Sequence, residues 1–286
     1  MSIQNLLIPG PDGDLSVRVK APSRASAGAV VLVQGSNLTG QSMFDFSFPG
    51  GDDYSLMDQI VALGFTAVTF AIRGYGASTL SGDPFGVTTE AAIEDLAAVM
   101  AWTIGQGHHR PHLLGFSWGG RIAGRYVETH GDTVDRLILY DPARGGGNVV
   151  LPAPGPGDGW WINSPDFYLE KFEPQHTAAD LRAALATHVV AHDARAPNGI
   201  RLENATPVTA IRPGEIRRPT LLVYGIDAAK ASYMQGGVSR ADFFEQLATD
   251  DKSFVILPGG GDFLHFQHGR HRLFQTIADF LAAPGA

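Results

Sequence analysis

The chain has 286 residues, of which 44% are hydrophobic and 17% charged, and its formal net charge at pH 7 is −8. This length suits one large α/β domain with an insertion, or two small domains. An acidic chain without a basic stripe argues against nucleic-acid binding. The sequence has no cysteine, which excludes disulfides, thiolate catalysis and cysteine-bound metal.

We find no signal peptide in residues 1–20, and no apolar run nears the roughly 20 residues that a membrane helix needs. These features predict a soluble, cytoplasmic protein with no membrane span and no cofactor. Its expected partner is a small molecule, apolar or acyl-bearing, and a homodimer is left open.

Taken in order, the chain alternates strand-like and helix-like segments. Residues 3–8 and 15–20 predict a hairpin around Pro11-Asp12-Gly13-Asp14. Apolar runs typical of strands buried in a parallel sheet lie at 29–33, 66–70, 112–114, 137–140, 220–224 and 253–257. Helical patterns are found at 54–63, 89–104, 121–127, 241–247 and 270–282. Residues 39–52 are expected to be loop.

This alternation predicts an α/β fold with a mostly parallel, doubly wound sheet. Residues 143–159 are rich in glycine and proline, and the chain then becomes aromatic and partly helical. We therefore predict a core of 1–142 and 216–286, with 143–215 inserted as a cap. Ligands of such sheets bind beyond the carboxyl ends of the strands, so polar residues there are expected to converge.

One motif stands out at such a strand end. Gly115-Phe116-Ser117-Trp118-Gly119 has the Gly-x-Ser-x-Gly pattern, and it lies between a predicted strand and a predicted helix. That context is typical of a nucleophile elbow, in which a sharp turn exposes a serine at the edge of a sheet. The pattern alone is weak, because glycine is abundant here; its placement is what favours Ser117 as a nucleophile.

With these segments in place, the chain resembles the α/β-hydrolase superfamily over nearly its whole length. The resemblance rests on residues 33–36, 73–78, 115–120 and 220–227, and Phe44-Asp45 with Tyr54-Ser55-Leu56 resembles an esterase-like or lysophospholipase-like subgroup. It implies that Ser117 is the nucleophile and that the backbone N–H groups of Ser36 and Trp118 form the oxyanion hole. It also implies an acid after strand 220–224 and a histidine after strand 253–257.

The sequence departs from that pattern at three positions. Gln34 stands where many relatives carry histidine, and as a side chain it can itself donate a hydrogen bond. Asp262 occupies the position expected for the catalytic histidine. Asp227 comes two residues after Gly225, where three are expected, and Ala228 holds the expected position.

Two residues are therefore candidates for the base. Histidine suits the role because its pKa lies near 6.5, so His265 is one candidate if the glycine-rich loop shifts its register. The other is Asp262, whose pKa a neighbouring carboxylate can raise. His265, His268 and His271 share a three-residue spacing, but no carboxylate–histidine spacing typical of zinc accompanies them, and we predict no metal.

The triad acid also has two candidates, Asp227 and Asp141, each of which follows a predicted strand and could instead be an ordinary turn aspartate. The resemblance favours Asp227, because the family carries its acid at that strand end. The substrate-binding candidates are polar strand-end residues and aromatic residues of the cap. They are Gln34, Asn37, Arg73, Trp160 and Trp161. For Arg73 a structural ion pair is an equal alternative, and for the tryptophans a role in the cap's own core.

Three functions follow. The first is a serine hydrolase acting on an ester, thioester or related acyl bond of an apolar small molecule. The second is a non-hydrolytic enzyme, a lyase or cyclase, in which Asp262 transfers protons and Ser117 only binds. The third is a catalytically silent binding protein. Fold alone does not decide among them.

Overall fold

The computed structural model describes residues 1–48, 51, 54–146, 151–228 and 238–283. At its centre is an eight-stranded sheet in the order β1-β2-β4-β3-β5-β6-β9-β10. The strands are β1 (Ser2–Gly10), β2 (Gly13–Ala21), β3 (Ala29–Val33), β4 (Thr66–Phe70), β5 (His112–Phe116), β6 (Leu137–Tyr140), β9 (Thr220–Gly225) and β10 (Lys252–Leu257). The predicted α/β class and mostly parallel sheet are confirmed.

The sheet has an antiparallel margin and a parallel centre. β1 and β2 form the expected hairpin, closed at the Gly10–Gly13 pair, and β2 runs antiparallel to β4. All other neighbours are parallel. Strands β3, β4, β5, β6 and β9 are buried throughout, because helices cover both faces of the sheet. Because the central strands are parallel, their carboxyl ends meet at one edge of the sheet.

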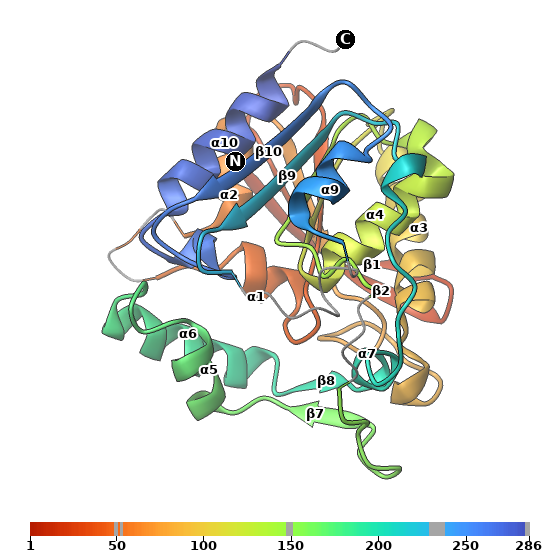
Figure 1. Ribbon diagram of the computed structural model, residues 1–286, viewed down its shortest axis with the longest axis vertical. Coiled ribbons are helices and arrows are strands. Elements are labelled where there is room, and N and C mark those ends of the chain that lie inside the picture. Colours follow the sequence, from red (N-terminus) through yellow and green to blue (C-terminus); the bar gives the residue numbers. More distant parts are fainter. Residues whose placement is uncertain (49–50, 52–53, 147–150, 229–237, 284–286) are drawn as a thin grey trace.

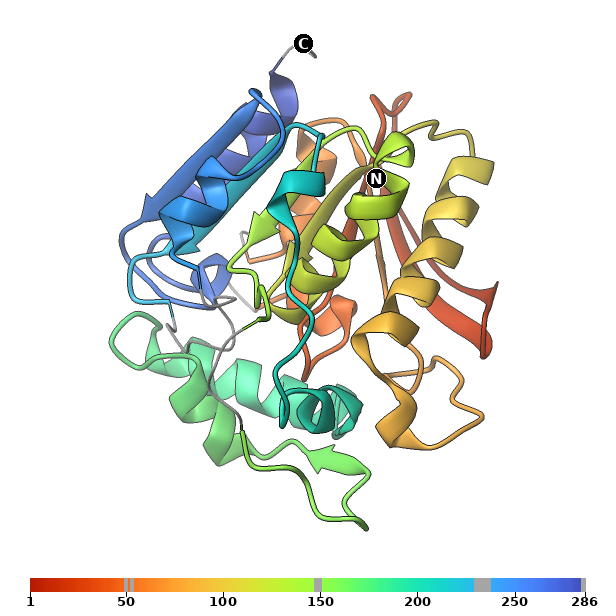
Figure 2. The ribbon, with the colours of Figure 1, turned by 45° about the vertical axis from the view of Figure 1, so that its right-hand side comes forward.

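Helices form a layer on each face (Figures 1 and 2). On one face, α3 (Thr89–Gly105), α4 (Trp118–His130) and α9 (Arg240–Glu245) enclose the apolar cluster that includes Val31, Leu139 and Phe243. On the other face are α1 (Gly40–Phe44), α2 (Leu56–Ala62) and α10 (Arg270–Ala282), with their own apolar cluster. Short 3₁₀ turns lie at Pro84–Gly86, Gly131–Thr133, Pro213–Glu215 and Leu264–Phe266.

Residues 160–203, called the cap below, lie apart from the sheet at its carboxyl edge and occupy the lower part of Figure 1. They form β7 (Trp160–Ile162), α5 (Pro165–Lys171), α6 (Ala179–His192), β8 (Arg195–Pro197) and α7 (Gly199–Glu203). β7 and β8 pair antiparallel, and α5 packs on α6. The wider boundaries 143–215 stay a prediction.

Buried and partly buried hydrogen bonds join the cap to the core at two places. Near one, Asn163 Nδ2 donates to the Asn37 carbonyl at 3.0 Å, and Thr39 donates to the Asp193 carboxylate from both its N–H and its hydroxyl, each at 3.2 Å. At the other, Glu203 accepts hydrogen bonds from the Thr89 N–H (2.8 Å) and hydroxyl (2.9 Å) at the start of α3. Cap and core are thus tied at both ends of the insertion.

One expectation is wrong. Residues 39–52 were expected to be loop, but α1 covers Gly40–Phe44. The helix begins because the Thr39 hydroxyl accepts a hydrogen bond from Ser42 N–H, which satisfies a free donor of the first turn. Its five residues are too few to show helical periodicity in the sequence. In the part of the chain that the structure describes, no helix is long and apolar enough to span a membrane.

Candidate active site

Ser117 lies at the sharp turn between β5 and α4. Its backbone is in a left-handed conformation, with φ 53° and ψ −114°, which is costly for a residue with a side chain and typical of functional sites. Neighbouring backbone fixes the turn: Ser117 N–H donates to the Tyr140 carbonyl, and its carbonyl accepts from Ala143 N–H. Within the described residues no hydrogen bond engages its half-buried hydroxyl.

The N-terminus of α4 sits directly against the end of β3. A side chain at Gly119 would collide with the backbone carbonyls of Val33 and Gln34, so only glycine permits this close packing. The packing brings Trp118 beside the loop that carries Ser36. No described residue accepts a hydrogen bond from either backbone N–H group. Two such free donors next to a serine hydroxyl can stabilise an oxyanion.

Side chains hold both donor residues in place. The Ser36 carbonyl accepts a hydrogen bond from the Tyr75 hydroxyl at 2.7 Å. The Trp118 indole N–H donates to the Thr89 hydroxyl at 3.0 Å, and Thr89 is itself bound to Glu203 of the cap. The position of Trp118 is therefore linked to the last helix of the cap.

Two buried carboxyl groups meet beside this turn. Asp141 follows β6, the strand next to β5, and its backbone is also left-handed, with φ 43°. Its side chain shares a hydrogen bond with Asp262. Burial, together with the charge and hydrogen bond of Asp262, raises the pKa of Asp141 well above its usual range. Two carboxyl groups that share a hydrogen bond are costly to ionise together, so the pair holds a proton more readily than a lone carboxyl group does.

Asp262 has a cationic partner from the cap. Lys171, the last residue of α5, places Nζ 2.8 Å from Asp262 Oδ2. Burial would lower the pKa of Lys171, but the charge and hydrogen bond of Asp262 outweigh it, and the pKa is raised. Asp262 thus has an acid on one side and an ammonium group on the other.

His265 lies in a different environment, three residues further along. It has no exposed surface, and its ring packs among Phe44, Phe116 and Phe266. Its Nδ1 is 3.0 Å from the Tyr140 hydroxyl. Burial lowers the pKa of His265 to about 3, against a smaller opposing effect of the Met43 backbone carbonyl. The ring is therefore neutral, and its hydrogen bonds do not include Ser117.

Asp227, the other candidate acid, points away from the carboxyl pair. Its side chain is 54% exposed, and its carboxylate lies 2.9 Å from His176 Nε2. Its backbone N–H does donate to the Gly260 carbonyl, which places it beside the loop that carries Asp262. Of the two aspartates proposed as triad acid, the structure brings Asp141 to Asp262 and leaves Asp227 near the surface.

Gln34 and Asn37 both act in the loop that carries Ser36. Gln34 is fully buried, and its Oε1 accepts from the N–H groups of Gly40 (3.1 Å) and Ile72 (3.4 Å). Its Nε2 has no hydrogen-bond partner among the described residues. Asn37 Oδ1 accepts from Arg201 of the cap at 2.7 Å and from the Ser36 hydroxyl at 3.1 Å.

Arg73 is engaged within the core. Its Nε lies 2.9 Å from Asp95 Oδ1, and its backbone N–H donates to the same carboxylate at 2.9 Å. A further hydrogen bond reaches the Ala91 carbonyl. This is the structural pairing that the sequence left as an alternative to substrate binding.

The two tryptophans lie in the cap, each beneath a guanidinium group. Arg195 stacks over Trp160 at 4.0 Å and Arg201 over Trp161 at 4.1 Å, measured from Cζ to ring centroid. Both indoles line an open cavity of about 390 Å³ on the cap, together with Asp158 and Asn198. They remain candidates for an apolar recognition surface.

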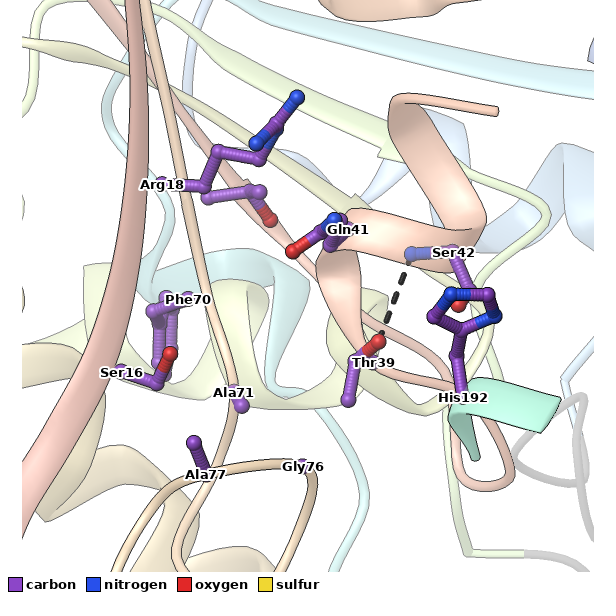
Figure 3. Close-up of a pocket in the computed structure, with 11 residues that line it drawn as sticks. Ser16, Arg18, Thr39, Gln41, Ser42, Phe70, Ala71, Gly76, Ala77 and His192 are labelled. Atoms are coloured by element: carbon purple, nitrogen blue, oxygen red, sulfur yellow. Dashed lines mark hydrogen bonds between the residues drawn. The ribbon is translucent and has the colours of Figure 1, made fainter. Parts of the chain in front are cut away.

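A second cavity, of about 190 Å³, is shown in Figure 3, and Ser117 does not line it. It lies between β2, β4, α1 and the end of α6. Its lining residues are Ser16, Arg18, Thr39, Gln41, Ser42, Thr69, Phe70, Ala71, Gly76, Ala77 and His192. None of the residues predicted for catalysis or substrate binding is among them. Within the described ranges, no group of three or more histidine or acidic side chains could hold a metal ion.

Sequence reasoning missed Lys171 and Tyr140. Lys171 is an ordinary helix-end lysine in the sequence, 91 positions from Asp262. Tyr140 is the last residue of a buried strand, and its hydroxyl contacts the Asp262 carbonyl (3.1 Å) as well as His265. No local pattern could have indicated either contact, because each depends on how the cap and the loop after β10 fold onto β6.

The comparisons with known proteins agree with this architecture. The model of the family described as "Alpha/beta hydrolase family" matches residues 30–276. No curated protein matches significantly in sequence. Among solved structures, an esterase from Thermogutta terrifontis has a TM-score of 0.67 at 18% identity, covering 97% of this chain and 98% of its own.

Two further structures are similar in fold. The enol-lactonase of Burkholderia xenovorans LB400 has a TM-score of 0.66 at 20% identity, with 97% of this chain and 100% of that chain covered. The bromoperoxidase of Bacillus anthracis has a TM-score of 0.69 at 17% identity, with 98% and 100% covered. At these identities the likeness concerns the fold.

The family model matches most of the chain, and the fold and the elbow agree with it. The protein belongs to the alpha/beta hydrolase family. As a member of that family it is an enzyme of the hydrolase type.

Proposed function

We propose that the protein hydrolyses an ester, thioester or related acyl bond of an apolar small molecule, with Ser117 as the nucleophile. The observation that carries the proposal is the left-handed backbone of Ser117 between β5 and α4, which holds an unengaged hydroxyl at the carboxyl edge of the sheet. Such strain persists only where the surrounding structure enforces it, and it is common where it serves catalysis.

In the first step, Ser117 Oγ attacks the acyl carbon and negative charge moves to the carbonyl oxygen. The backbone N–H groups of Ser36 and Trp118 receive that oxygen. A donor of this kind typically contributes about 10²–10³ to the rate, because it is already oriented when the charge develops. The donors are backbone groups, so the replacement of histidine by Gln34 leaves them intact.

Proton transfer falls to the carboxyl pair. Serine is a weak nucleophile at neutral pH and needs a base. We assign that role to Asp262, which holds the family's histidine position and shares a proton with Asp141. A carboxylate is a weaker base than imidazole. The expected substrates are therefore acyl groups with good leaving groups, such as thioesters and activated esters.

His265 stays the alternative base, and the pair also favours a second function. A protonated Asp141 beside an ionised Asp262 is suited to giving and taking protons without covalent chemistry. In that function the enzyme is a lyase or a cyclase, and Ser117 binds the substrate. A protein that only binds is the third alternative.

The decisive experiment is labelling with a fluorophosphonate probe, followed by mass spectrometry to locate the adduct. An adduct on Ser117 that is absent from Ser117→Ala supports the hydrolase proposal. Turnover of a panel of thioesters and p-nitrophenyl esters then defines the acyl group. Folded protein that forms no adduct and cleaves no ester overturns the proposal. Ligand-induced thermal stabilisation without turnover would then favour binding.

A further inference from the structure

Lys171 joins the cap to the carboxyl pair and has no role in the function proposed above. It ends α5, and its Nζ is 2.8 Å from Asp262 Oδ2 and 5.6 Å from the centroid of the Phe263 ring. The Asp262 side chain is 11% exposed and the Lys171 side chain 38%. The ammonium group therefore covers one side of the carboxylate, while Asp141 occupies another.

A second contact between the cap and the loop after β10 fixes the geometry of the Lys171–Asp262 ion pair. Two residues after Lys171, Glu173 has a left-handed backbone, with φ 52°. Its carboxylate accepts a hydrogen bond from Gln267 Nε2, and Gln267 Oε1 accepts from Gly261 N–H at 2.8 Å. The Glu173 carboxylate also fills the space that a side chain at Gly261 would need. The cap thus holds the loop on both sides of Asp262.

The charged and titratable groups around the pair come from five elements. Lys171 and Glu173 face it from the cap, and Arg240 lies near Asp141 at the start of α9. Three further titratable groups of the described residues lie near the pair and are uncharged at neutral pH: Tyr140 of β6, Tyr224 of β9 and His265 of the loop itself. Lys171 forms an ion pair with Asp262.

We propose that Lys171 is a positioning residue that keeps Asp262 ionised, so that the proton shared by the two carboxyl groups stays on Asp141. The cap thereby determines which carboxyl accepts a proton and which donates one. This inference rests on the proposed function for its catalytic consequence, but the placement of the proton can be measured without any substrate.

The proton balance of the cycle is simple. The pair begins with one proton and gains a second from Ser117 as the Oγ–acyl bond forms. It returns one to the leaving group as the bond between the acyl carbon and the leaving group breaks. A water molecule then attacks the acyl-enzyme and gives its proton to the pair, which passes one to Ser117 as the serine leaves. The pair ends with the single proton with which it began.

Lys171→Met removes the positive charge and keeps much of the side-chain volume. An opposite charge at this distance lowers a carboxyl pKa by about one unit or more. Without it the pair takes up its second proton more readily, so the acid limb of the pH–kcat profile should move upward by about one pH unit. Lys171→Arg keeps the charge and should restore the limb. Arg182→Met is the matched control, because Arg182 binds the Leu169 carbonyl of the cap.

The independent readout is carbon NMR of the aspartate carboxyl groups, titrated with pH in protein labelled at Asp Cγ. Asp141→Asn and Asp262→Asn assign the two signals. We expect a protonated Asp141 and an ionised Asp262 at pH 7, and a shared proton in Lys171→Met. A protonated Asp262 in the unaltered protein, or an unchanged titration in Lys171→Met, overturns the inference. If the NMR result is as expected but no ester is cleaved, only the hydrolase proposal fails.

Discussion

The loop after β10 carries two titratable side chains three residues apart, and their surroundings are opposite. Asp262 meets a carboxyl group and an ammonium group, whereas His265 is enclosed by aromatic rings and the Tyr140 hydroxyl. Histidine is the better base in water, but here burial keeps it neutral and engaged. The comparison teaches that position in the fold, more than residue type, sets the charge environment of each side chain.

The largest effect on turnover is expected at Ser117, the proposed nucleophile. Ser117→Ala should reduce ester turnover by about 10³-fold or more, because only oxyanion stabilisation and binding remain. Initial rates on an activated ester measure the loss, and circular dichroism checks the fold. Turnover that survives in the folded variant would remove Ser117 from the mechanism.

Asp262→Asn tests Asp262 as the proposed base. The amide keeps the size of the side chain but cannot accept a proton, so kcat should fall by about 10²-fold or more. Asp262→His should instead raise kcat, since it puts imidazole, a stronger base than a carboxylate, at the position that we assign to the base. If Asp262→Asn is fully active, the base lies elsewhere and His265 becomes the candidate.

His265→Ala tests whether the buried histidine takes part in catalysis. Removing a fully buried ring leaves a cavity, which typically costs about 2–5 kcal/mol of unfolding free energy. The kcat of the protein that remains folded should stay within about threefold. Urea unfolding and active-site titration separate the two quantities. A loss of kcat equal to that of Ser117→Ala, at unchanged stability, would identify His265 as the base.

The two groups should also give stability opposite dependences on pH. The pKa of His265 is lowered in the folded state, so its contribution is present above pH 6.5 and is lost as the pH falls toward about 3. The pKa of Asp141 is raised, so its contribution is present below pH 3.8 and is lost as the pH rises through its folded value. Each limiting slope is about 1.4 kcal/mol per pH unit.

Variants assign these slopes. His265→Phe should remove the loss of stability on acidification, and Asp141→Asn should remove the opposite trend. The measurement is urea unfolding from pH 4 to pH 8 for both variants and the unaltered protein. Identical pH profiles in all three would show that neither group is perturbed as described.

The smallest effect on turnover is expected at Asp227, which follows β9. Asp227→Ala removes a half-exposed pair with His176, and exposed pairs contribute about 0–1 kcal/mol. Turnover should change by less than about threefold, whereas Asp141→Ala should lower it strongly. Turnover is measured for both variants side by side. If Asp227→Ala lowers it more than Asp141→Ala does, the assignment of the acid is reversed.

Local sequence predicted much of the framework. The buried strands were visible as apolar runs such as 29–33, and the elbow at Ser117 was visible because its glycines and its strand–helix context are local features. The short helix α1 was not visible, since one threonine cap and five residues carry no periodic signal.

The site was less predictable. Asp262 was recognised as occupying the histidine position, but its pairing with Asp141 over Asp227 depends on the direction of two side chains at neighbouring strand ends. The burial of His265 depends on Phe44 and Phe116, which come from distant segments. Lys171 reaches the site only because the cap folds back over the sheet. Such contacts follow from tertiary packing, which no single segment encodes.

Two sets of hydrogen bonds limit how the cap can move to admit a substrate. They join Glu203 to Thr89 and Thr39 to Asp193. A cap that swings as a rigid body would have to break both sets of bonds, of which the Thr39–Asp193 set is buried and the Glu203–Thr89 set partly buried. These bonds therefore oppose a large opening of the cap. They also mean that a cap transplanted from another member of the family would need matching anchor residues in its new host.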